Sequence, residues 1–503
     1  MSCILGPRRW CVSFFAFAHF LVLELALGAV LVLVASGTAA YANPPLAVAI
    51  KDAHVVTVSG ADLPKATVLL RDGLIEDVGP NLTIPADAWV IDGNGLTVYP
   101  GFINGLSTWG IAEAAPAGGA AGGQRGAATP TQTIPGAATP RSHGPEDRPQ
   151  TYSYERAADM VKPSDHRLAG VRDIGFTSSA TFPNRGIFTG LGAMIDLAGD
   201  RGEDMVVAQP IGEQIVLRTG GFRSGFPGSL MGVIAYIRQL YLDLGQYQQA
   251  KAIYAANVNG TPRPEYDHYL EGLAEAPRIL LPADESQQID RLLAFSKELK
   301  QPAVIYGLHE AFLRIDELKQ ANLPVLVNLH WPEPSREANP ADVPSLRELE
   351  MRAKAPSVPS MLAKAGVPFA FYSEGADGAA DIRKQVKKAI DAGLSKADAI
   401  KALTLTPAQI YSVSDRLGSI DKGKIANIVV TKGDAFDDKT TVEYVFIDGR
   451  MFEPSKVPPA GPPGGRGGAG AGAQRTPPET ASGDLDRAGD ADNQAASVRG
   501  GQN

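Results

Sequence analysis

The sequence predicts an α/β protein, in which a TIM-like (β/α)₈ barrel is joined to a composite β-sandwich built from both ends of the mature chain. Two observations lead to this prediction. Between residues 151 and 412, strand-like and helix-like segments alternate in units of the length expected for βα repeats. Outside that region, short segments rich in β-branched residues occur at 46–98, and again at 425–431 and 442–447.

The β-rich segments at the two ends of the chain define the predicted domains. Residues 43–98 and 413–455 are expected to form the two parts of one β-sandwich, because a sheet shared by both ends must enclose what lies between them. The barrel then spans residues 99–412. The alternative is two separate small sheets, each of marginal stability on its own.

Residues 1–42 have the pattern of a signal peptide. Arg8 and Arg9 precede a long apolar run, and small residues then lead to Ala42 at the end of an A-x-A motif. The pattern predicts a cleaved leader and an exported, periplasmic protein. An uncleaved N-terminal membrane anchor is the alternative, and His19 and Glu24 within the apolar run weigh against it.

Composition narrows the function classes. Both cysteines, Cys3 and Cys11, lie in the leader, so the mature chain is expected to have no disulfide, thiol nucleophile or thiolate metal site. The net charge of −8 gives no reason to expect nucleic acid as a partner. We expect a small-molecule ligand, membrane contact only through an uncleaved leader, and leave an oligomer open.

Two stretches lack the apolar periodicity of a folded segment. Residues 114–150 are rich in Ala, Gly, Pro and Thr, and are predicted to be a flexible insertion, either a lid or a solvated spacer. Residues 456–503 are rich in Gly, Pro and Ala, and are predicted to be a disordered tail. Between them, residues 229–256 carry apolar side chains at helical spacing, which predicts a long helix capped by Ser229.

Several motifs carry a resemblance to a known family, in the same order along the chain. They are Arg71-Asp72-Gly73-Leu74-Ile75, Pro100-Gly101-Phe102-Ile103, Thr406-Pro407-Ala408, Gly423-Lys424-Ile425-Ala426-Asn427 and Ile447-Asp448-Gly449-Arg450. The set resembles the amidohydrolase superfamily, most closely its exported imidazolonepropionase-like branch. The resemblance implies a TIM barrel with a composite β-sandwich, and a metal-activated water that attacks a C–N bond.

The same resemblance implies metal ligands that this sequence lacks. Leu106 and Thr108 stand where the first strand of the family carries two histidines. Pro282 and Tyr306 stand near two further histidine positions, and the last strand ends in Glu374 where an aspartate is usual. The resemblance therefore implies an amidohydrolase whose usual metal site is degraded.

Polar residues near the predicted strand ends offer a rebuilt site. Glu374 and His330 are the candidate catalytic residues, and His309, His330 and Glu374 would hold a divalent metal such as zinc only if the site is rebuilt. Arg185 and Asn328 are candidates for substrate binding. The alternative is structural: His309 caps its helix, His330 forms a structural hydrogen bond beside Trp331, and Arg185 lies in a surface turn.

Two functions follow from these patterns. The first is a hydrolase of non-peptide C–N bonds by resemblance, with its activity lost or altered. The second is a non-catalytic envelope protein that uses the barrel mouth for binding or scaffolding. The cofactor stays unknown at this point.

Overall fold

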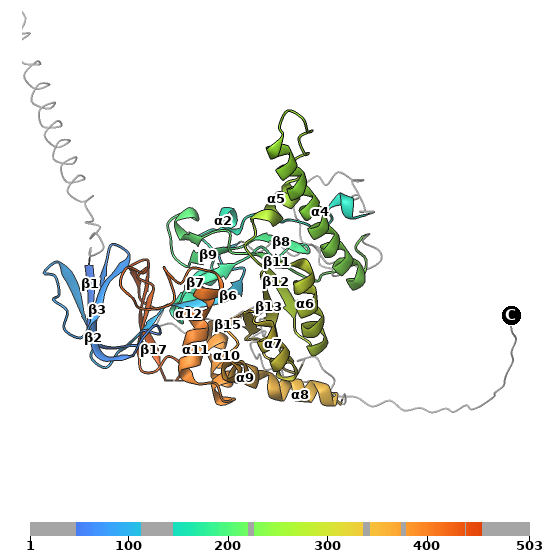
Figure 1. The fold of residues 1–503 in the computed structure, drawn as a ribbon. Helices are drawn as coiled ribbons and strands as arrows, with labels where there is room; N and C mark the ends of the chain where they lie inside the picture. The colour runs from blue at the N-terminus through green and yellow to red at the C-terminus, as the bar shows by residue number, and fades with distance from the viewer. Residues whose placement is uncertain are drawn as a thin grey trace, which may run out of the picture. The chain divides into compact units, whose positions relative to one another are not determined.

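The computed structural model describes residues 47–111, 144–219, 226–334, 343–373, 379–437 and 439–454 (Figure 1). The predicted leader, the predicted tail, most of the predicted insertion and Glu374 lie outside these residues. The described chain is mixed α/β, as the sequence predicts, and is built from three sheets and the helices packed against them.

Strands from both ends of the described chain share one eight-stranded sheet. Its order is β18-β17-β16-β5-β1-β2-β3, with β4 paired to β1. The two ends join where β16 runs antiparallel to β5, with Val429 opposite Tyr99. The strands are β1 (Ala47–Val55), β2 (Leu63–Arg71), β3 (Leu74–Gly79), β4 (Ala88–Asp92), β5 (Thr97–Pro100), β16 (Ile428–Lys432), β17 (Thr441–Ile447) and β18 (Arg450–Phe452).

The central strands form two further sheets. A four-stranded sheet has the order β10-β9-β7-β6, and a six-stranded sheet has the order β15-β14-β13-β12-β11-β8. The strands are β6 (Phe102–Ser107), β7 (Phe176–Thr181), β8 (Phe188–Leu191), β9 (Ala193–Asp196), β10 (Val206–Ala208), β11 (Glu213–Ile215), β12 (Ile279–Ala283), β13 (Ala303–Gly307), β14 (Val325–Asn328) and β15 (Phe369–Tyr372).

The closed hydrogen-bonded barrel that the sequence predicts is not formed by these strands. No ladder joins the described residues of β6 and β15, although the two strands lie close together. A Cβ atom on Gly105 would lie 2.8 Å from the carbonyl oxygen of Phe371. The side chain of Asn104 bridges the seam: its Oδ1 accepts from the backbone N–H of Ser373 at 3.2 Å, and its Nδ2 donates to the Ser373 hydroxyl at 2.7 Å. A side chain thus uses a backbone donor that a ladder would need.

Helices follow most of the central strands. The α-helices are α2 (Ala157–Met160), α3 (Arg167–Asp173), α4 (Leu230–Ala256), α5 (His268–Glu275), α6 (Ser286–Leu299), α7 (Ile315–Ala321), α8 (Leu346–Lys354), α9 (Val358–Ala365), α10 (Ala379–Asp391), α11 (Lys396–Leu403) and α12 (Leu405–Ile410). Short 3₁₀ turns are η1 (Pro145–Asp147), η2 (Glu203–Met205), η4 (Ala311–Leu313) and η5 (Ala355–Ser357). The predicted long helix is confirmed as α4, and Ser229 caps it by accepting from the backbone N–H of Gly232.

Part of the stretch predicted to be flexible is placed by the structure. Residues 144–150 include η1, and Arg148 directly after it pairs with Asp243 of α4 and with Asp267. Among the described helices, none combines the length and apolar character needed to cross a bilayer.

Candidate functional site

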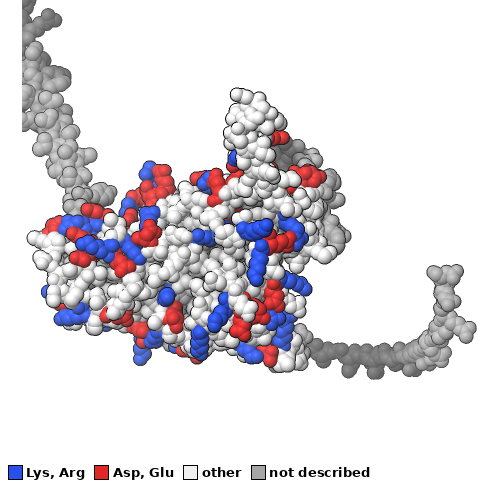
Figure 2. Space-filling view, in the orientation of Figure 1, with Lys and Arg blue, Asp and Glu red and all other residues white. Residues whose placement is uncertain are grey.

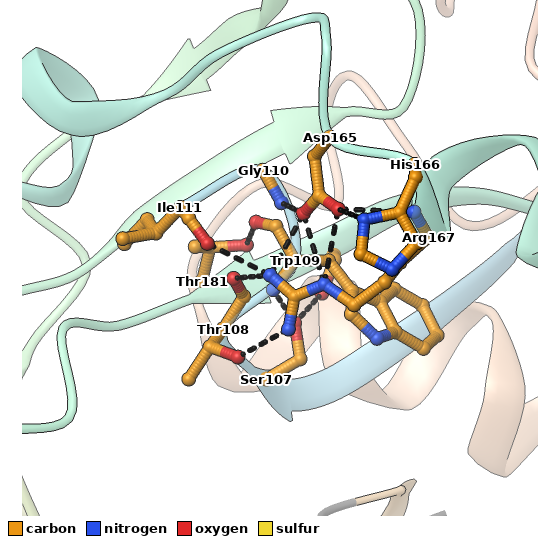
Figure 3. Close-up of polar contacts among 10 residues, drawn as sticks. Ser107, Thr108, Trp109, Gly110, Ile111, Asp165, His166, Arg167 and Thr181 are labelled. Carbon is orange, nitrogen blue, oxygen red and sulfur yellow. Dashed lines mark hydrogen bonds and ion pairs between the residues drawn. The ribbon is translucent and has the colours of Figure 1, made fainter. Parts of the chain in front are cut away.

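The turn after β6 is held by Arg167, the first residue of α3 (Figure 3). Its Nη1 donates to Oγ1 of Thr108 across 2.9 Å, and its Nη2 donates to the carbonyls of Thr108 and Ile111 at 2.8 Å. The guanidinium also pairs with Asp165, whose Oδ2 lies 2.7 Å from Nη2. Asp165 accepts from the backbone N–H of Gly110 at 2.9 Å. We call these five residues the Arg167 cluster.

The ion pair within the Arg167 cluster is largely shielded from water, since the side chains of Arg167 and Asp165 are 20% and 4% exposed. Burial acts to raise the pKa of Asp165, but hydrogen bonds from Arg167 and Gly110 outweigh it and hold that pKa below its usual value. Asp165 is therefore charged at neutral pH. All three guanidinium nitrogens donate to protein acceptors, so Arg167 acts as a structural clamp on the turn.

The side chain of Leu106, near the end of β6, lies in an apolar core between the two central sheets. Leu106 is 3% exposed, and the same core contains Tyr306 of β13 and Tyr372 of β15. The two tyrosine rings meet edge to face, with centroids 6.0 Å apart. The Tyr306 hydroxyl donates to the carbonyl of Ile215 at 2.9 Å. This region is therefore filled by apolar and aromatic groups.

A second polar group lies at the ends of β12, β13 and β14. These strands are parallel, so their carboxyl ends lie along one edge of the sheet. Asp284 directly follows β12, and His309 and His330 each come two residues after β13 and β14. Nδ1 of His309 lies 3.3 Å from Oδ1 of Asp284. We call Asp284, His309 and His330 the His309 cluster.

The backbone that presents His309 is in an uncommon conformation. Gly307 has φ +112°, and a Cβ atom there would lie 2.4 Å from Oδ1 of Asp284. Leu308 has φ +74°, in the left-handed region that a leucine rarely adopts. The Leu308 N–H donates to the carbonyl of Ala283 at 2.9 Å, which ties the turn to the end of β12. Strained backbone of this kind is concentrated at functional sites in proteins.

The pKa values of Asp284 and His309 in the His309 cluster are shifted from their usual values. Burial raises the pKa of the Asp284 carboxyl, and the nearby His309 acts in the opposite direction. Burial lowers the pKa of His309; Asp284 opposes this shift, and His330 adds to it. The His309 side chain is 13% exposed, and its Nε2 is buried without a hydrogen-bond partner among the described residues.

The neighbours of the His309 cluster are structural. Asn328 accepts from the backbone N–H of His330 through its Oδ1 at 2.8 Å, so its side chain shapes the turn after β14. The ring of Trp331 meets that of His309 edge to face, with centroids 6.3 Å apart, and its Nε1 donates to the carbonyl of Gln385.

Glu310 directly follows His309, and its buried carboxylate lies against the N-terminus of α6. Its carboxylate accepts from Nε of Arg347 at 2.7 Å and from the backbone N–H of Ser286 at 3.0 Å. The hydrogen bond from Arg347 lowers the pKa of Glu310, which keeps it charged. These contacts join α8 to the N-terminus of α6 and leave Glu310 as a structural carboxylate.

The remaining predicted site residues are not brought to the His309 cluster by any described contact. Arg185 is 56% exposed, pairs with Glu155, and has its guanidinium carbon 4.0 Å from the ring centroid of Tyr152. Glu374 lies outside the described residues. Within the part of the chain that the structure describes, no group of three or more His, Cys, Asp or Glu side chains could hold a metal ion.

Three polar groups had no role in the sequence-based prediction. Asp284 follows Pro282 in sequence, and only its contact with His309 gives it a role. Arg167 and Asp165 form part of a short polar run, and their contacts with the turn after β6 come from the fold. Glu213 of β11 is fully buried, which raises its pKa to about 8. The sequence gives little signal for Glu213, because Gly212 precedes it and the polar Gln214 follows it.

A comparison with protein families finds a match in the C-terminal part of the described chain. Residues 297–452 match the amidohydrolase family model. The match covers less than half of the chain and includes β13 to β15, both histidines of the His309 cluster, and β16 to β18. A comparison with characterised protein sequences gives no significant match.

Solved structures show similarity at different levels. An amidohydrolase from Thermotoga maritima MSB8 is 24% identical, with a TM-score of 0.64, over 81% of this chain and 100% of that one. Phenylurea hydrolase B and molinate hydrolase are each 16% identical, with TM-scores of 0.46 and 0.43. They cover 81% and 82% of this chain, and 97% and 95% of their own chains. The similarity to the Thermotoga maritima protein shows that this chain has the fold of an amidohydrolase. The other two similarities are too low to support a conclusion about this chain.

The metal that an amidohydrolase fold implies can be tested against Leu106 near the end of β6 and Thr108 directly after it. The leucine at position 106 has no ligand atom and is surrounded by apolar groups. Oγ1 of Thr108 lies 2.9 Å from the guanidinium of Arg167, and a fixed cation at that distance repels a divalent metal ion. Leu106 and Thr108 therefore do not fit a metal centre.

Proposed function

We propose that this chain is a member of the amidohydrolase superfamily in which the metal centre of the first barrel strand is replaced by the Arg167 cluster, and that it binds a small ligand without metal-dependent hydrolysis. The observation that carries this proposal is the hydrogen bond from Arg167 to Thr108, next to the buried Leu106. Arg167 supplies a positive charge and Leu106 an apolar surface, at the place where the superfamily pattern requires two metal ligands.

The proposal includes the finer architecture. The central strands are an open form of the superfamily's TIM barrel, with one seam at β6 and β15, and the eight-stranded sheet corresponds to its composite β-sandwich. The similarity to the Thermotoga maritima amidohydrolase supports this assignment. The degraded ligand set at Leu106 and Thr108 supports placement outside the metal-dependent members.

We also propose export to the periplasm, on the basis of the leader pattern in residues 1–42. The mature protein would then act in the envelope as a binding or scaffold protein. Cell fractionation with mass spectrometry of the N-terminus tests both export and cleavage. Cytoplasmic protein that keeps residues 1–42 would refute this part of the proposal.

A ligand of the superfamily's substrate class tests the binding proposal. Amides, ureas, lactams and dipeptides are offered to the purified protein with a chelator present, and binding is measured by calorimetry. We expect at least one compound to bind with the same affinity with and without the chelator, and to remain intact. Turnover that the chelator abolishes would contradict the proposal.

A hydrolase of C–N bonds is the second candidate, and the His309 cluster favours it. A buried histidine beside a carboxylate, with its other ring nitrogen unpartnered among the described residues, is the arrangement of a general base. In this case His309 takes a proton from the attacking water and Asp284 keeps the ring oriented. His330 and Glu374 are the predicted companions of His309.

Substitution separates the two candidates. His309→Ala should abolish any turnover of the same compounds, whereas His54→Ala, in β1 of the eight-stranded sheet, should leave it unchanged. If the protein only binds, neither substitution produces or removes a hydrolytic rate. Turnover that His309→Ala leaves intact would exclude the His309 cluster as the catalytic centre.

A further inference from the structure

Glu213 of β11 and Tyr241 of α4 each have a buried oxygen atom without a hydrogen-bond partner among the described residues. Glu213 is 0% exposed, and its Oε1 accepts from the backbone N–H of Gly190 at 3.0 Å. The unpartnered atoms are Oε2 of Glu213 and the hydroxyl oxygen of Tyr241. Buried polar groups in proteins are nearly always bonded to protein or to ordered water, so both atoms require an explanation. We call Glu213 and Tyr241 the buried pair.

The side chain of Glu213 points into the layer between α4 and the strands β8 and β11. Phe188 of β8 is paired with Ile215 of β11, and both belong to the apolar core that includes the inner face of α4. Gln214 points to the opposite side of β11, where its Nε2 donates to the hydroxyl of Tyr306 at 3.5 Å. Successive side chains of a strand alternate between its two faces. Glu213 and Ile215 therefore both face α4.

Tyr241 approaches Glu213 from the side of α4. Its ring meets that of Phe188, with centroids 6.3 Å apart, and Gly190, which binds Glu213, lies two positions further along β8. Burial raises the pKa of the Tyr241 hydroxyl, and the carboxylate of Glu213 raises it further, so the two groups lie within electrostatic reach of each other. They are not bonded to each other directly, since each is unpartnered among the described residues. A third group that bonds both would satisfy them.

The layer around Glu213 provides no counter-charge. Burial raises the pKa of its carboxyl to about 8, and the hydrogen bond from Gly190 opposes this shift. The charged side chains of α4 form ion pairs elsewhere, which are Arg238–Glu298, Asp243–Arg148 and Lys251–Glu271. Figure 2 shows the contrast with the surface, where acidic and basic side chains lie next to one another. Glu213 is therefore protonated at pH 7, and its carboxyl group can both donate and accept a hydrogen bond.

These properties define the chemical class of molecule that fits the buried pair. The molecule must donate and accept hydrogen bonds, and it must be uncharged, because a charge in this apolar layer would be unpaired. A metal cation is a poorer occupant, since hard cations such as calcium take six or more oxygen ligands and the pair supplies two. Water fits, because buried waters occupy polar sites where they bond groups that have no other partner.

We infer that one buried water molecule bridges Oε2 of Glu213 and the hydroxyl of Tyr241, and so links β11 to α4. This internal site is separate from the Arg167 and His309 clusters and does not depend on the proposed function. Tyr241 lies about one turn before Leu244, the last buried residue of α4. The bridge therefore holds the helix to the core at the place where its buried face ends.

A crystal structure of the mature protein that resolves ordered water tests the inference directly. We expect one water within about 3.2 Å of both oxygen atoms of the buried pair. It should persist in Glu213→Gln, because an amide also donates and accepts, and it should be lost in Glu213→Leu. A direct hydrogen bond between the two side chains, a metal ion in place of the water, or no bound molecule between them would overturn the inference.

Titration of Glu213 tests the bridge in solution. Tyr241→Phe removes the hydroxyl that holds the water, so the charged carboxylate loses a hydrogen bond and the pKa of Glu213 should rise by about half a unit or more. Tyr236→Phe is the matched control on the same helix, because the Tyr236 hydroxyl bonds directly to Thr151 at 2.5 Å, and it should leave that pKa unchanged.

NMR of isotope-labelled glutamate carboxyl carbons measures the pKa of Glu213 in the wild type and in both tyrosine variants. Circular dichroism confirms that the variants are folded. A pKa that Tyr241→Phe leaves unmoved, or that both tyrosine substitutions move equally, would contradict a bridge between Glu213 and Tyr241.

Discussion

Arg167 and Thr108 are joined by a 2.9 Å hydrogen bond between a guanidinium nitrogen and a threonine hydroxyl, although they lie 59 residues apart in sequence. The bond links the first residue of α3 to the turn after β6. It places a permanent positive charge at the strand end where the amidohydrolase pattern has a metal ligand. This contact stabilises the turn, and in our proposal it also takes the place of a metal centre there.

Removing the guanidinium should destabilise the protein. Arg167→Ala leaves the buried Asp165 carboxylate without its cation, and we expect the free energy of unfolding to fall by about 3 kcal/mol, as for other broken buried pairs. Urea denaturation measures the change. Arg201→Ala is the control, because its ion pairs with Glu203 and Asp204 are largely exposed and should contribute little to stability. Equal effects of the two substitutions would contradict the role given to Arg167.

The turn before His309 should depend on glycine for space as well as for conformation. Gly307→Ala introduces a Cβ atom 2.4 Å from Asp284 and also strains a backbone at φ +112°. Gly366→Ala introduces strain at φ +77° with no atom within 4 Å. We expect both to lower the melting temperature, and Gly307→Ala to lower it more. If Gly366→Ala is equally damaging, strain alone explains the effect and the close approach of Asp284 is not required.

Glu213 should make the protein less stable as the pH rises. Its pKa is raised to about 8 in the folded state, so between about pH 4.5 and pH 8 the folded state binds a proton that the unfolded state has released. Stability from this residue is complete below pH 4.5, falls across that interval, and changes no further above pH 8. Burial is the cause, and one hydrogen bond from the Gly190 N–H to Oε1 only partly compensates.

The Glu213→Gln variant tests this dependence, because an amide does not titrate. The difference in melting temperature between wild type and Glu213→Gln should shift in favour of the variant as the pH rises from 5 to 8. Asp196→Asn offers a second comparison, since burial raises the pKa of Asp196 to about 7 and its interval ends earlier. A difference that stays constant across this range would contradict a neutral Glu213 in the folded state.

The pKa of His309 should depend on Asp284. Asp284→Asn removes the carboxylate charge that opposes the burial-induced fall in the pKa of His309. We therefore expect the pKa of His309, measured by NMR titration of its ring protons, to fall further in this variant. His166→Ala serves as a spectral control, because His166 is 91% exposed and lies away from Asp284 in sequence. An unchanged titration of His309 would show that the 3.3 Å contact does not govern its charge.

The sequence predicts local features of this fold well. Ser229 at the start of α4 and Ser395 at the start of α11 are recognisable caps, because capping depends on residues three positions apart. The two β-rich ends predicted a composite β-sandwich, and β5 and β16 do pair within one sheet, while the sandwich itself stays a prediction. The amidohydrolase fold was predicted from motifs spread along the chain. In each case the information lies in short patterns.

The candidate site was predicted less completely, because its contacts are long-range. Nothing near Thr108 indicates that Arg167 will reach it across the segment between them. His309 meets Asp284 because Leu308 adopts φ +74°, a conformation that a leucine does not announce in sequence. The seam at Asn104 and Ser373 likewise depends on a side chain that replaces a ladder hydrogen bond. When a side chain takes the place of a backbone hydrogen bond, or in our proposal of a metal ligand, the sequence shows no periodic pattern that would reveal it.

The metal content of the purified mature protein tests the central claim most directly. Elemental mass spectrometry would be carried out without added metal and after mild dialysis, on wild type and on His309→Ala, His330→Ala and Glu374→Ala. We predict no stoichiometric zinc, manganese or iron in any of them, because Arg167 and Leu106 occupy the strand end that would hold it. About one equivalent of metal in the wild type, lost in these variants, would contradict the account and establish a rebuilt metallohydrolase centre.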